Sequence, residues 1–234
     1  MMRCALRRLP LLGLFLVSPL IVQYVAHAAE SCPCDVNGDG EVTVNELIQG
    51  VNASLEGCPT PGPRFKDNSD GTITDTVTRL QWEKKDSFND VGEPLVCPGE
   101  PTCDNPHDAD NRYTWSAEGS APDGSAYTDF LAKLNSGGGF AGHTDWRLPT
   151  VDELQNLVDH ARFDPSIDPL FNTACSPTCT VVTCSCTVRD SYWTVTPVVD
   201  APSNIWAVDF NRGLVSYYDD ATLPLYVRAV RGGV

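Results

Sequence analysis

The sequence is poor in positive charge. Its 234 residues contain 16 lysines and arginines against 31 aspartates and glutamates, a formal net charge of −15. Nucleic acids and anionic lipid surfaces attract proteins through clustered basic residues. This charge balance therefore argues against both kinds of partner, and we expect no nucleic-acid binding.

The sequence also lacks a recognisable catalytic motif. Of its four histidines, His107, His143 and His160 stand near no serine or cysteine in a nucleophile motif, and His27 falls in the N-terminal apolar segment. Paired carboxylates are too common in so acidic a chain to indicate a general acid and base. We therefore expect that the protein is not an enzyme.

Apart from one N-terminal segment, the chain has no long apolar run. Three arginines precede the apolar residues 9–25, which two prolines interrupt, and Ala26-His27-Ala28 offers a small-x-small cleavage pattern. This order predicts a signal peptide over residues 1–28. The alternative is a retained anchor, for which the interrupted run is short. We expect a secreted or cell-surface protein with no stable membrane span, whose mature net charge is −18.

One segment matches every position of the calcium-loop pattern D-x-[DN]-x-[DN]-G-x5-E. Calcium requires several oxygen ligands, and a twelve-residue loop of this kind supplies them from alternate positions and from a closing glutamate. The alternative is an acidic, glycine-rich turn that binds no metal. We predict a Ca²⁺ cofactor with these ligands: Asp35, Asn37, Asp39, the Glu41 carbonyl and Glu46.

The calcium loop belongs to a short N-terminal module. After the loop, Leu47, Val51 and Leu55 recur every four residues, which predicts a short helix with one apolar stripe in need of a partner surface. We place an EF-hand-like helical module at residues 29–58 and a stiff, proline-rich linker at residues 59–63.

Ten cysteines in an exported chain indicate disulfides. Cys97 and Cys103 flank a five-residue loop and are predicted to pair. Cysteines 175, 179, 184 and 186 share one Thr/Ser-rich insertion, where three pairings are open and a four-thiolate zinc site is the competing interpretation. Loss of Cys4 with the signal leaves an odd number, so a free thiol or an intermolecular bridge, and hence an oligomer, is possible.

From residue 64 onwards, the pattern is one of strands with two helices. The helices are expected over 127–134 and from Thr150, where Glu153 completes a capping box. Strands are expected over the following ranges: 72–82, 191–196, 205–210, 214–218 and 225–230. This order predicts an α+β domain with a mainly antiparallel sheet.

Several blocks of this region resemble the Lcl_C family, the C-terminal domain of a collagen-like bacterial adhesin. They include residues 64–75, Trp146-Arg147-Leu148-Pro149-Thr150, and Val227-Arg228-Ala229-Val230-Arg231-Gly232. The resemblance covers about 64–233 and implies a surface-associated binding role. The family's adhesin is associated with sulfated glycosaminoglycans, a ligand class that an acidic chain does not favour.

Two further resemblances concern the fold. The Arg147-Leu148-Pro149-Thr150 block and the terminal Arg231-Gly232-Gly233 also resemble the formylglycine-generating-enzyme fold, which implies a C-type-lectin-like domain over residues 64–234. The catalytic cysteine pair of those enzymes and the sugar-coordinating motifs of true C-type lectins have no counterpart here. The N-terminal module resembles a single dockerin repeat, although dockerins use two repeats to grip a cohesin.

Exposed aromatic residues are the best candidates for contacting a ligand. Trp206, Tyr217 and Tyr218 lie on the predicted terminal hairpin, where a sugar ring could stack on them. Trp146 is instead expected in the core, with Arg147 paired to a nearby acid. Residues 67–75 could form a second calcium site, but a hairpin turn is the better interpretation.

These observations predict an adhesin-type binding protein that recognises a glycan or an extracellular partner. The alternative is a docking module that binds a cell-surface protein through its calcium unit. A secreted enzyme on the formylglycine-type fold is the third and least supported hypothesis.

Overall fold

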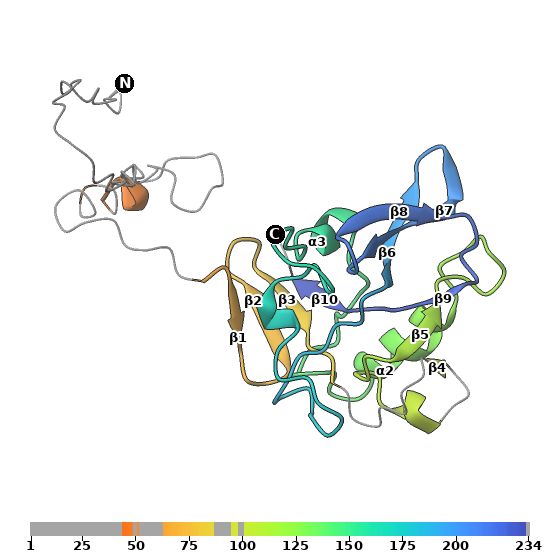
Figure 1. The fold of residues 1–234 in the computed structure, drawn as a ribbon, viewed down its shortest axis with the longest axis horizontal. Coiled ribbons are helices and arrows are strands. Elements are labelled where there is room, and N and C mark those ends of the chain that lie inside the picture. Colours follow the sequence, from red (N-terminus) through yellow and green to blue (C-terminus); the bar gives the residue numbers. More distant parts are fainter. Residues whose placement is uncertain (1–43, 49–50, 52–62, 87–94, 98–100, 233–234) are drawn as a thin grey trace, which may run out of the picture. The chain divides into compact units, whose positions relative to one another are not determined.

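The computed structural model describes residues 44–48, 51, 63–86, 95–97 and 101–232 (Figure 1). The chain divides into two compact units, residues 1–58 and 59–234. The predicted signal peptide, residues 29–43 and several later residues of the calcium module, and most of the proline linker lie outside the described residues. Their boundaries therefore remain predictions.

The described part of the first unit is one short helix. Residues 44–48 are helical, as is Val51. Val44, Leu47, Ile48 and Val51 are exposed, whereas Glu46 is only 5% exposed. Two residues of the predicted apolar stripe, Leu47 and Val51, are therefore exposed to solvent, and the third, Leu55, lies outside the described residues.

The second unit begins with a four-stranded antiparallel sheet in the order β1-β2-β3-β10. Its strands are β1 (Phe65–Asp67), β2 (Thr72–Asp75), β3 (Leu80–Glu83) and β10 (Val230–Gly232). Asp67 accepts a hydrogen bond from the Ser69 amide and so forms the turn between β1 and β2. The last strand of the described chain thus pairs with the third.

Two smaller sheets complete the strands (Figure 1). One, in the order β4-β5-β9, pairs β4 in parallel and β9 antiparallel with the central β5. The other is an antiparallel meander of β6, β7 and β8. The strands are β4 (Leu95–Val96), β5 (Asn111–Thr114), β6 (Ser191–Val198), β7 (Ala201–Asp209), β8 (Leu214–Tyr218) and β9 (Pro224–Leu225).

Both predicted helices are present, and both are short. The first is a π-helical segment, η2 (Ala126–Leu131), that continues into α2 (Ala132–Leu134). The second, α3 (Val151–Gln155), begins with the predicted capping box between Thr150 and Glu153. Two 3₁₀ turns, η1 (Pro101–Asp104) and η3 (Pro169–Phe171), lie in the connecting segments.

The prediction of one strand over residues 225–230 is wrong. The segment splits into β9 and β10, which belong to different sheets. Between them, Tyr226 exchanges backbone hydrogen bonds with β6, and the Ala229 amide donates to the Glu83 carboxylate at 2.9 Å. These backbone groups find partners without a continuous ladder because the segment crosses from one sheet to another.

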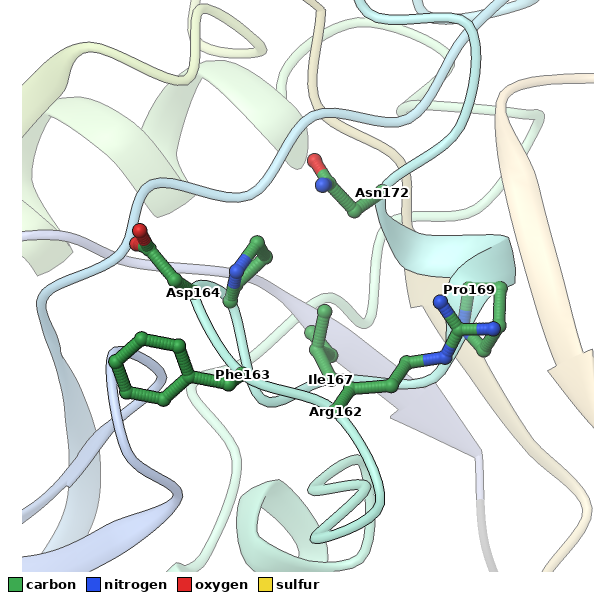
Figure 2. Close-up of a pocket in the computed structure, with 7 residues that line it drawn as sticks. Arg162, Phe163, Asp164, Ile167, Pro169 and Asn172 are labelled. Carbon is green, nitrogen blue, oxygen red and sulfur yellow. The ribbon is translucent and has the colours of Figure 1, made fainter.

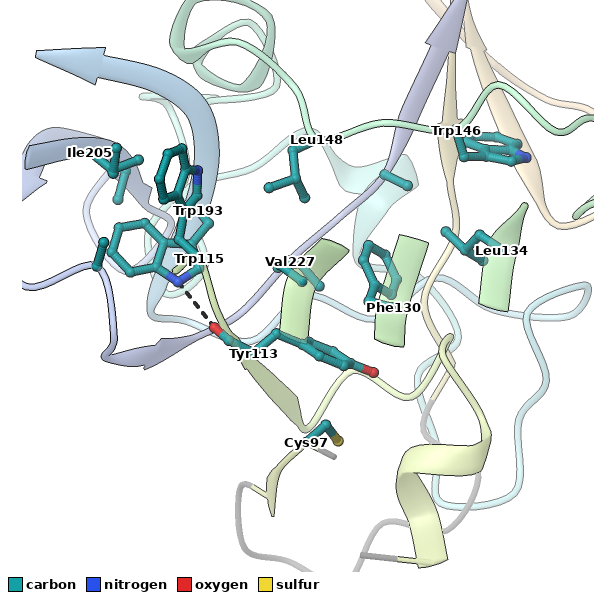
Figure 3. Close-up of a cluster of buried hydrophobic side chains, with 14 of the residues drawn as sticks. Cys97, Tyr113, Trp115, Phe130, Leu134, Trp146, Leu148, Trp193, Ile205 and Val227 are labelled. Atoms are coloured by element: carbon teal, nitrogen blue, oxygen red, sulfur yellow. Dashed lines mark hydrogen bonds between the residues drawn. The ribbon is translucent and has the colours of Figure 1, made fainter. Parts of the chain in front are cut away.

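The meander of β6, β7 and β8 has a hydrophobic cluster on each face. On one face, Trp193, Ile205 and Ala207 join the cluster around Tyr113 and Phe130, where the Trp193 indole donates to the Tyr113 carbonyl at 3.1 Å (Figure 3). On the other face, Tyr192, Val208 and Phe210 join a cluster that includes Trp82, Leu154 and Phe171. The alternation of side chains along a strand explains how one sheet serves two cores.

Three disulfides lie within the second unit. The predicted Cys97–Cys103 bridge is confirmed. Of the three pairings open to the other four cysteines, the structure has the nested one, Cys175–Cys186 around Cys179–Cys184. The architecture is mixed, with mostly antiparallel sheets and few helices, which agrees with the predicted α+β class. The lectin-like assignment and the EF-hand module remain predictions.

Candidate functional site

Two of the three predicted ligand-binding residues lie together on the surface. Trp206 of β7 is paired directly with Tyr217 of β8, and their rings meet edge to face with centroids 5.6 Å apart. Tyr217 is 54% exposed and Trp206 is half-buried. We refer to Trp206 and Tyr217 as the aromatic platform.

The hairpin turn fixes the register that brings these rings together. The Asp209 carboxylate accepts a hydrogen bond from the Asn211 amide at 2.7 Å, and Gly213 has a φ of 68°, which favours glycine. Val208 then faces Val215, and two residues further on Trp206 faces Tyr217. The Thr194 hydroxyl donates to the Trp206 carbonyl at 2.6 Å and holds β7 against β6.

Tyr218 does not belong to the platform. Neighbouring residues of a strand point to opposite faces, so Tyr218 turns away from Tyr217. Its hydroxyl donates to the Ser191 hydroxyl at 2.8 Å, and its ring packs against Trp193 with centroids 5.5 Å apart. The structure thus gives Tyr218 a packing role beside the first hydrophobic cluster.

The surroundings of the platform are polar and contain no basic residue on either strand. Asn204 and Asp219 stand two residues along the chain from Trp206 and Tyr217, respectively, and neither β7 nor β8 contains lysine or arginine. An aromatic face flanked by amide and carboxylate groups suits a neutral or cationic ring with hydroxyl groups. A sulfated or carboxylated ligand would find no counter-charge on these strands.

A separate open pocket of about 330 Å³ is lined by residues from the segment 162–172 (Figure 2). Its aromatic residue, Phe163, is 72% exposed. The charged residues of the pocket are paired. Arg162 Nε lies 3.3 Å from the Asp159 carboxylate, and the Asp164 carboxylate lies 2.7 Å from Arg189 Nη1. The lining residues are Arg162, Phe163, Asp164, Pro165, Ile167, Pro169 and Asn172.

A buried network of charged residues connects β3 with the crossing segment. Glu83, which is 0% exposed, lies 3.1 Å from the Lys85 ammonium and 2.8 Å from His107. Arg228, also 0% exposed, donates to the Glu83 carbonyl, the Cys186 carbonyl and the Thr187 hydroxyl. Buried charges require such partners because their desolvation is costly.

The electrostatics of this network follow from burial and pairing. Burial raises the pKa of Glu83, but the Lys85 ammonium and His107 outweigh it and hold that pKa below its ordinary value. Burial lowers the pKa of Lys85 against the opposing effect of Glu83. The network lies in the interior and is bonded to the backbone of three segments. It therefore serves to hold these segments together.

The predicted roles of the Trp146 and Arg147 pair are confirmed. Trp146 is 3% exposed and its indole donates to the Phe140 carbonyl, while Arg147 makes two bonds of 2.7 Å to the Glu153 carboxylate. Of the two arginines near the C-terminal end, Arg228 is buried and Arg231 pairs with Asp145. Each of the three arginines is held by hydrogen bonds within the second unit.

Only Glu46 of the predicted calcium ligands falls within the described residues; Asp35, Asn37, Asp39 and Glu41 lie outside them. Glu46 is buried while its helical neighbours are exposed, as suits a carboxylate that closes a metal loop. At the second candidate site, Asp67 pairs with Lys84 and Asp75 with Arg64, which supports the turn interpretation.

Sequence reasoning missed the pocket and the two buried lysines. Lys84 and Lys85 are 1% and 2% exposed, although lysine is rarely buried. The pocket is formed by loop residues with no periodicity, so no pattern could have indicated it. The only signal for the lysines was their place at the end of a strand rich in aromatic and β-branched residues.

Comparison with known proteins gives one match. The profile of the Lcl C-terminal domain matches residues 71–231, which is more than half of the chain. No curated protein and no solved structure matches the sequence. None of the helices in the described residues is both long and apolar enough to span a membrane.

Proposed function

Because the chain belongs to the Lcl C-terminal domain family, an extracellular and surface-associated domain, we propose that it is a binding protein of adhesin type. In this proposal the aromatic platform of Trp206 and Tyr217 stacks against a sugar ring of an extracellular glycan. The observation that carries it is the pairing of two partly exposed aromatic rings at 5.6 Å on one face of a rigid hairpin.

The ligand class follows from charge. The mature chain carries 31 acidic residues, and the two strands of the platform carry no basic one. A highly sulfated chain would be repelled at this face at physiological ionic strength. The proposed ligand is therefore a neutral or amino sugar, bound by stacking and by hydrogen bonds to Asn204 and Asp219.

A glycan array with the full chain tests this proposal. We expect retention of neutral or amino-sugar glycans, lowered about five-fold by Trp206→Ala or Tyr217→Ala, since a stacked aromatic ring contributes about 1 kcal/mol. Leu214→Ala is the matched control, because Leu214 lies on the same strand, is 53% exposed and faces the other side. Unchanged binding by both platform variants would contradict the proposed site.

The pocket offers a competing location for the same ligand. Phe163→Ala removes its exposed ring without touching the platform. If Phe163→Ala abolishes binding and Trp206→Ala does not, the ligand occupies the pocket. If no glycan is retained by any form of the protein, recognition through sugar is excluded.

A second candidate function rests on the first unit. The helix at 44–48 exposes Val44 at 72%, Leu47 at 50% and Ile48 at 53%, and Val51 follows at 59%. Such a contiguous apolar stripe is typical of a surface that docks a protein. In this alternative the calcium-bound module attaches the protein to a cell-surface partner, and the Lcl C-terminal domain remains free.

A pull-down separates the two functions. The full chain and its Glu46→Ala variant are used as baits in calcium and then in chelator. Loss of the partner in chelator, or with the Glu46→Ala variant in calcium, supports docking through the module. Glycan binding by the same samples should be unchanged. A Leu47→Asp variant, which keeps the calcium ligands, should also lose the partner.

We propose binding without catalysis. All six described cysteines of the second unit are bridged. An enzyme of the formylglycine type requires a reactive cysteine pair, so a count of free thiols tests this part of the proposal. Two free thiols assigned to residues 175–186 would argue for the enzyme.

A further inference from the structure

The four cysteines of the insertion form a compact group of sulfur atoms. Beyond the two bridges, Cys179 Sγ lies 3.8 Å from Cys186 Sγ, and Cys186 Sγ lies 4.0 Å from Cys184 Sγ. The sulfurs of Cys175, Cys179 and Cys186 all lie within 4.8 Å of one another. Within the described residues, this is the one group with spacing suitable for holding a metal ion.

Two of these distances are close to the sulfur–sulfur spacing of a tetrathiolate metal site. Zinc binds thiolates at about 2.3 Å, so a tetrahedral site places its sulfurs about 3.8 Å apart. Two of the contacts between the bridges already have this length. The two bonded pairs would have to separate, and Cys184, which lies outside the group of three, would have to approach Cys175.

The surroundings suit an anionic metal–thiolate centre. The Lys84 ammonium donates to the Val182 carbonyl at 3.1 Å, and Arg228 donates to the Cys186 carbonyl at 2.7 Å, so two cations are bonded to this loop. The Ser185 hydroxyl and the Arg228 Nε are buried and have no hydrogen-bond partner among the described residues. Donors of this kind commonly orient and stabilise metal-bound thiolates.

We infer that the reduced form of this cluster, Cys175, Cys179, Cys184 and Cys186, is a binding site for Zn²⁺ or a similar thiophilic divalent cation. The same loops are then closed by disulfides in oxidising surroundings and by metal in reducing ones. Neither the family nor the proposed glycan binding assigns such a site.

The chemistry balances with a named reductant. A phosphine and one water molecule reduce each disulfide to two thiols and yield one phosphine oxide. The four thiols then bind one Zn²⁺ and release their protons, about four per metal ion. Oxidation removes the thiolates, so the oxidised chain has no site.

The test uses the full chain reduced with a phosphine and titrated with Co²⁺, whose visible absorption distinguishes tetrahedral thiolate from oxygen coordination. We expect one such Co²⁺ per chain, displaced by Zn²⁺, and none in the oxidised chain. The Cys175→Ser/Cys179→Ser variant should lose the band, whereas Cys97→Ser/Cys103→Ser, which also lacks two cysteines, should keep it.

Folding is controlled in two ways. Cys175 is exposed, so the single Cys175→Ser variant leaves the buried cysteines intact and should bind at least about ten-fold more weakly. Near-ultraviolet circular dichroism should show that Zn²⁺ restores tertiary packing in the reduced chain. The inference is overturned if the reduced chain binds no Co²⁺ or if the double variant retains the thiolate band.

Discussion

At the scale of single residues, charged side chains that are paired with one another stabilise the second unit. Glu153 illustrates the point, because it caps α3 and binds Arg147 through both carboxylate oxygens. Arg147 holds the pKa of Glu153 below its ordinary value of 4.5, against the opposing effect of burial, which is the largest single contribution. The same direction holds for Asp75 beside Arg64.

The first prediction concerns acid stability. A carboxyl whose pKa is lower in the folded chain stabilises it above the unfolded pKa, and this contribution disappears as the pH falls through the folded pKa. The free energy of unfolding should therefore decline below about pH 5. Glu153→Gln should unfold about 1 kcal/mol more easily at pH 7, and this difference should shrink in acid. Denaturant titrations at several pH values measure both effects, and a pH-independent difference would contradict the assignment.

The second prediction concerns the buried network. Glu83→Gln leaves Lys85 buried without its counter-charge, which should lower the free energy of unfolding by about 3–5 kcal/mol. Asp145→Asn is the control, because Asp145 pairs with Arg231 at the surface and is 58% exposed. Thermal unfolding of the two variants distinguishes them. Small and equal losses of stability in the two variants would show that the buried pair of Glu83 and Lys85 contributes little to folding.

At the scale of elements, the hairpin of β7 and β8 connects the fold with the proposed function. Its rungs place Trp206 and Tyr217 on one face and Ile205 and Tyr218 on the other. The strand pattern and the turn at residues 211–213 were predictable, since apolar runs flank a glycine-containing turn. Which tyrosine lies beside Trp206 was not, because two adjacent tyrosines give no indication of which face is covered.

The third prediction tests the turn of this hairpin. Gly213 has a φ of 68°, and an added Cβ would lie 2.5 Å from Val158 Cγ1. Gly213→Ala should therefore lower the free energy of unfolding by more than about 1 kcal/mol. Gly138→Ala is the control, because nothing lies within 4 Å of a Cβ at that position. Chemical denaturation measures both, and a stable Gly213→Ala variant would contradict this packing.

Elements also show where sequence patterns failed. The run over residues 225–230 reads as one strand, yet it divides between two sheets because Arg228 is buried and bonds to three partners at the point of crossing. The capping box at Thr150 was predicted correctly because its hydrogen bonds join residues only three apart. Hydrogen bonds between residues close in sequence can be predicted from the sequence, whereas those between distant segments cannot.

At the scale of the whole molecule, the chain divides into two compact units. The two large hydrophobic clusters consist of residues from the second unit. Calcium, which we propose for the first unit, should therefore affect the two units differently.

The fourth prediction follows from this division. Calcium should stabilise only the first unit of the full chain, by an amount that grows with the ratio of its concentration to the dissociation constant. Hydrogen exchange should show protection around residues 44–51 in calcium, lost in chelator and in Glu46→Ala. Glu46→Gln, which keeps one oxygen ligand, should lose less. A uniform change over residues 64–232 would contradict independent units.

The sequence by itself determined what depends on composition and on short spacings: the acidic charge, the α+β order, the capping box, the Cys97–Cys103 bridge and the family to which residues 71–231 belong. Only the tertiary structure decided what depends on contacts between distant segments. It selected one pairing of the four clustered cysteines, buried Lys85 and Arg228, and separated Tyr218 from the platform of Trp206 and Tyr217. The physical reason is that burial and long-range pairing arise when strands from different parts of the chain meet, and no local pattern records where they meet.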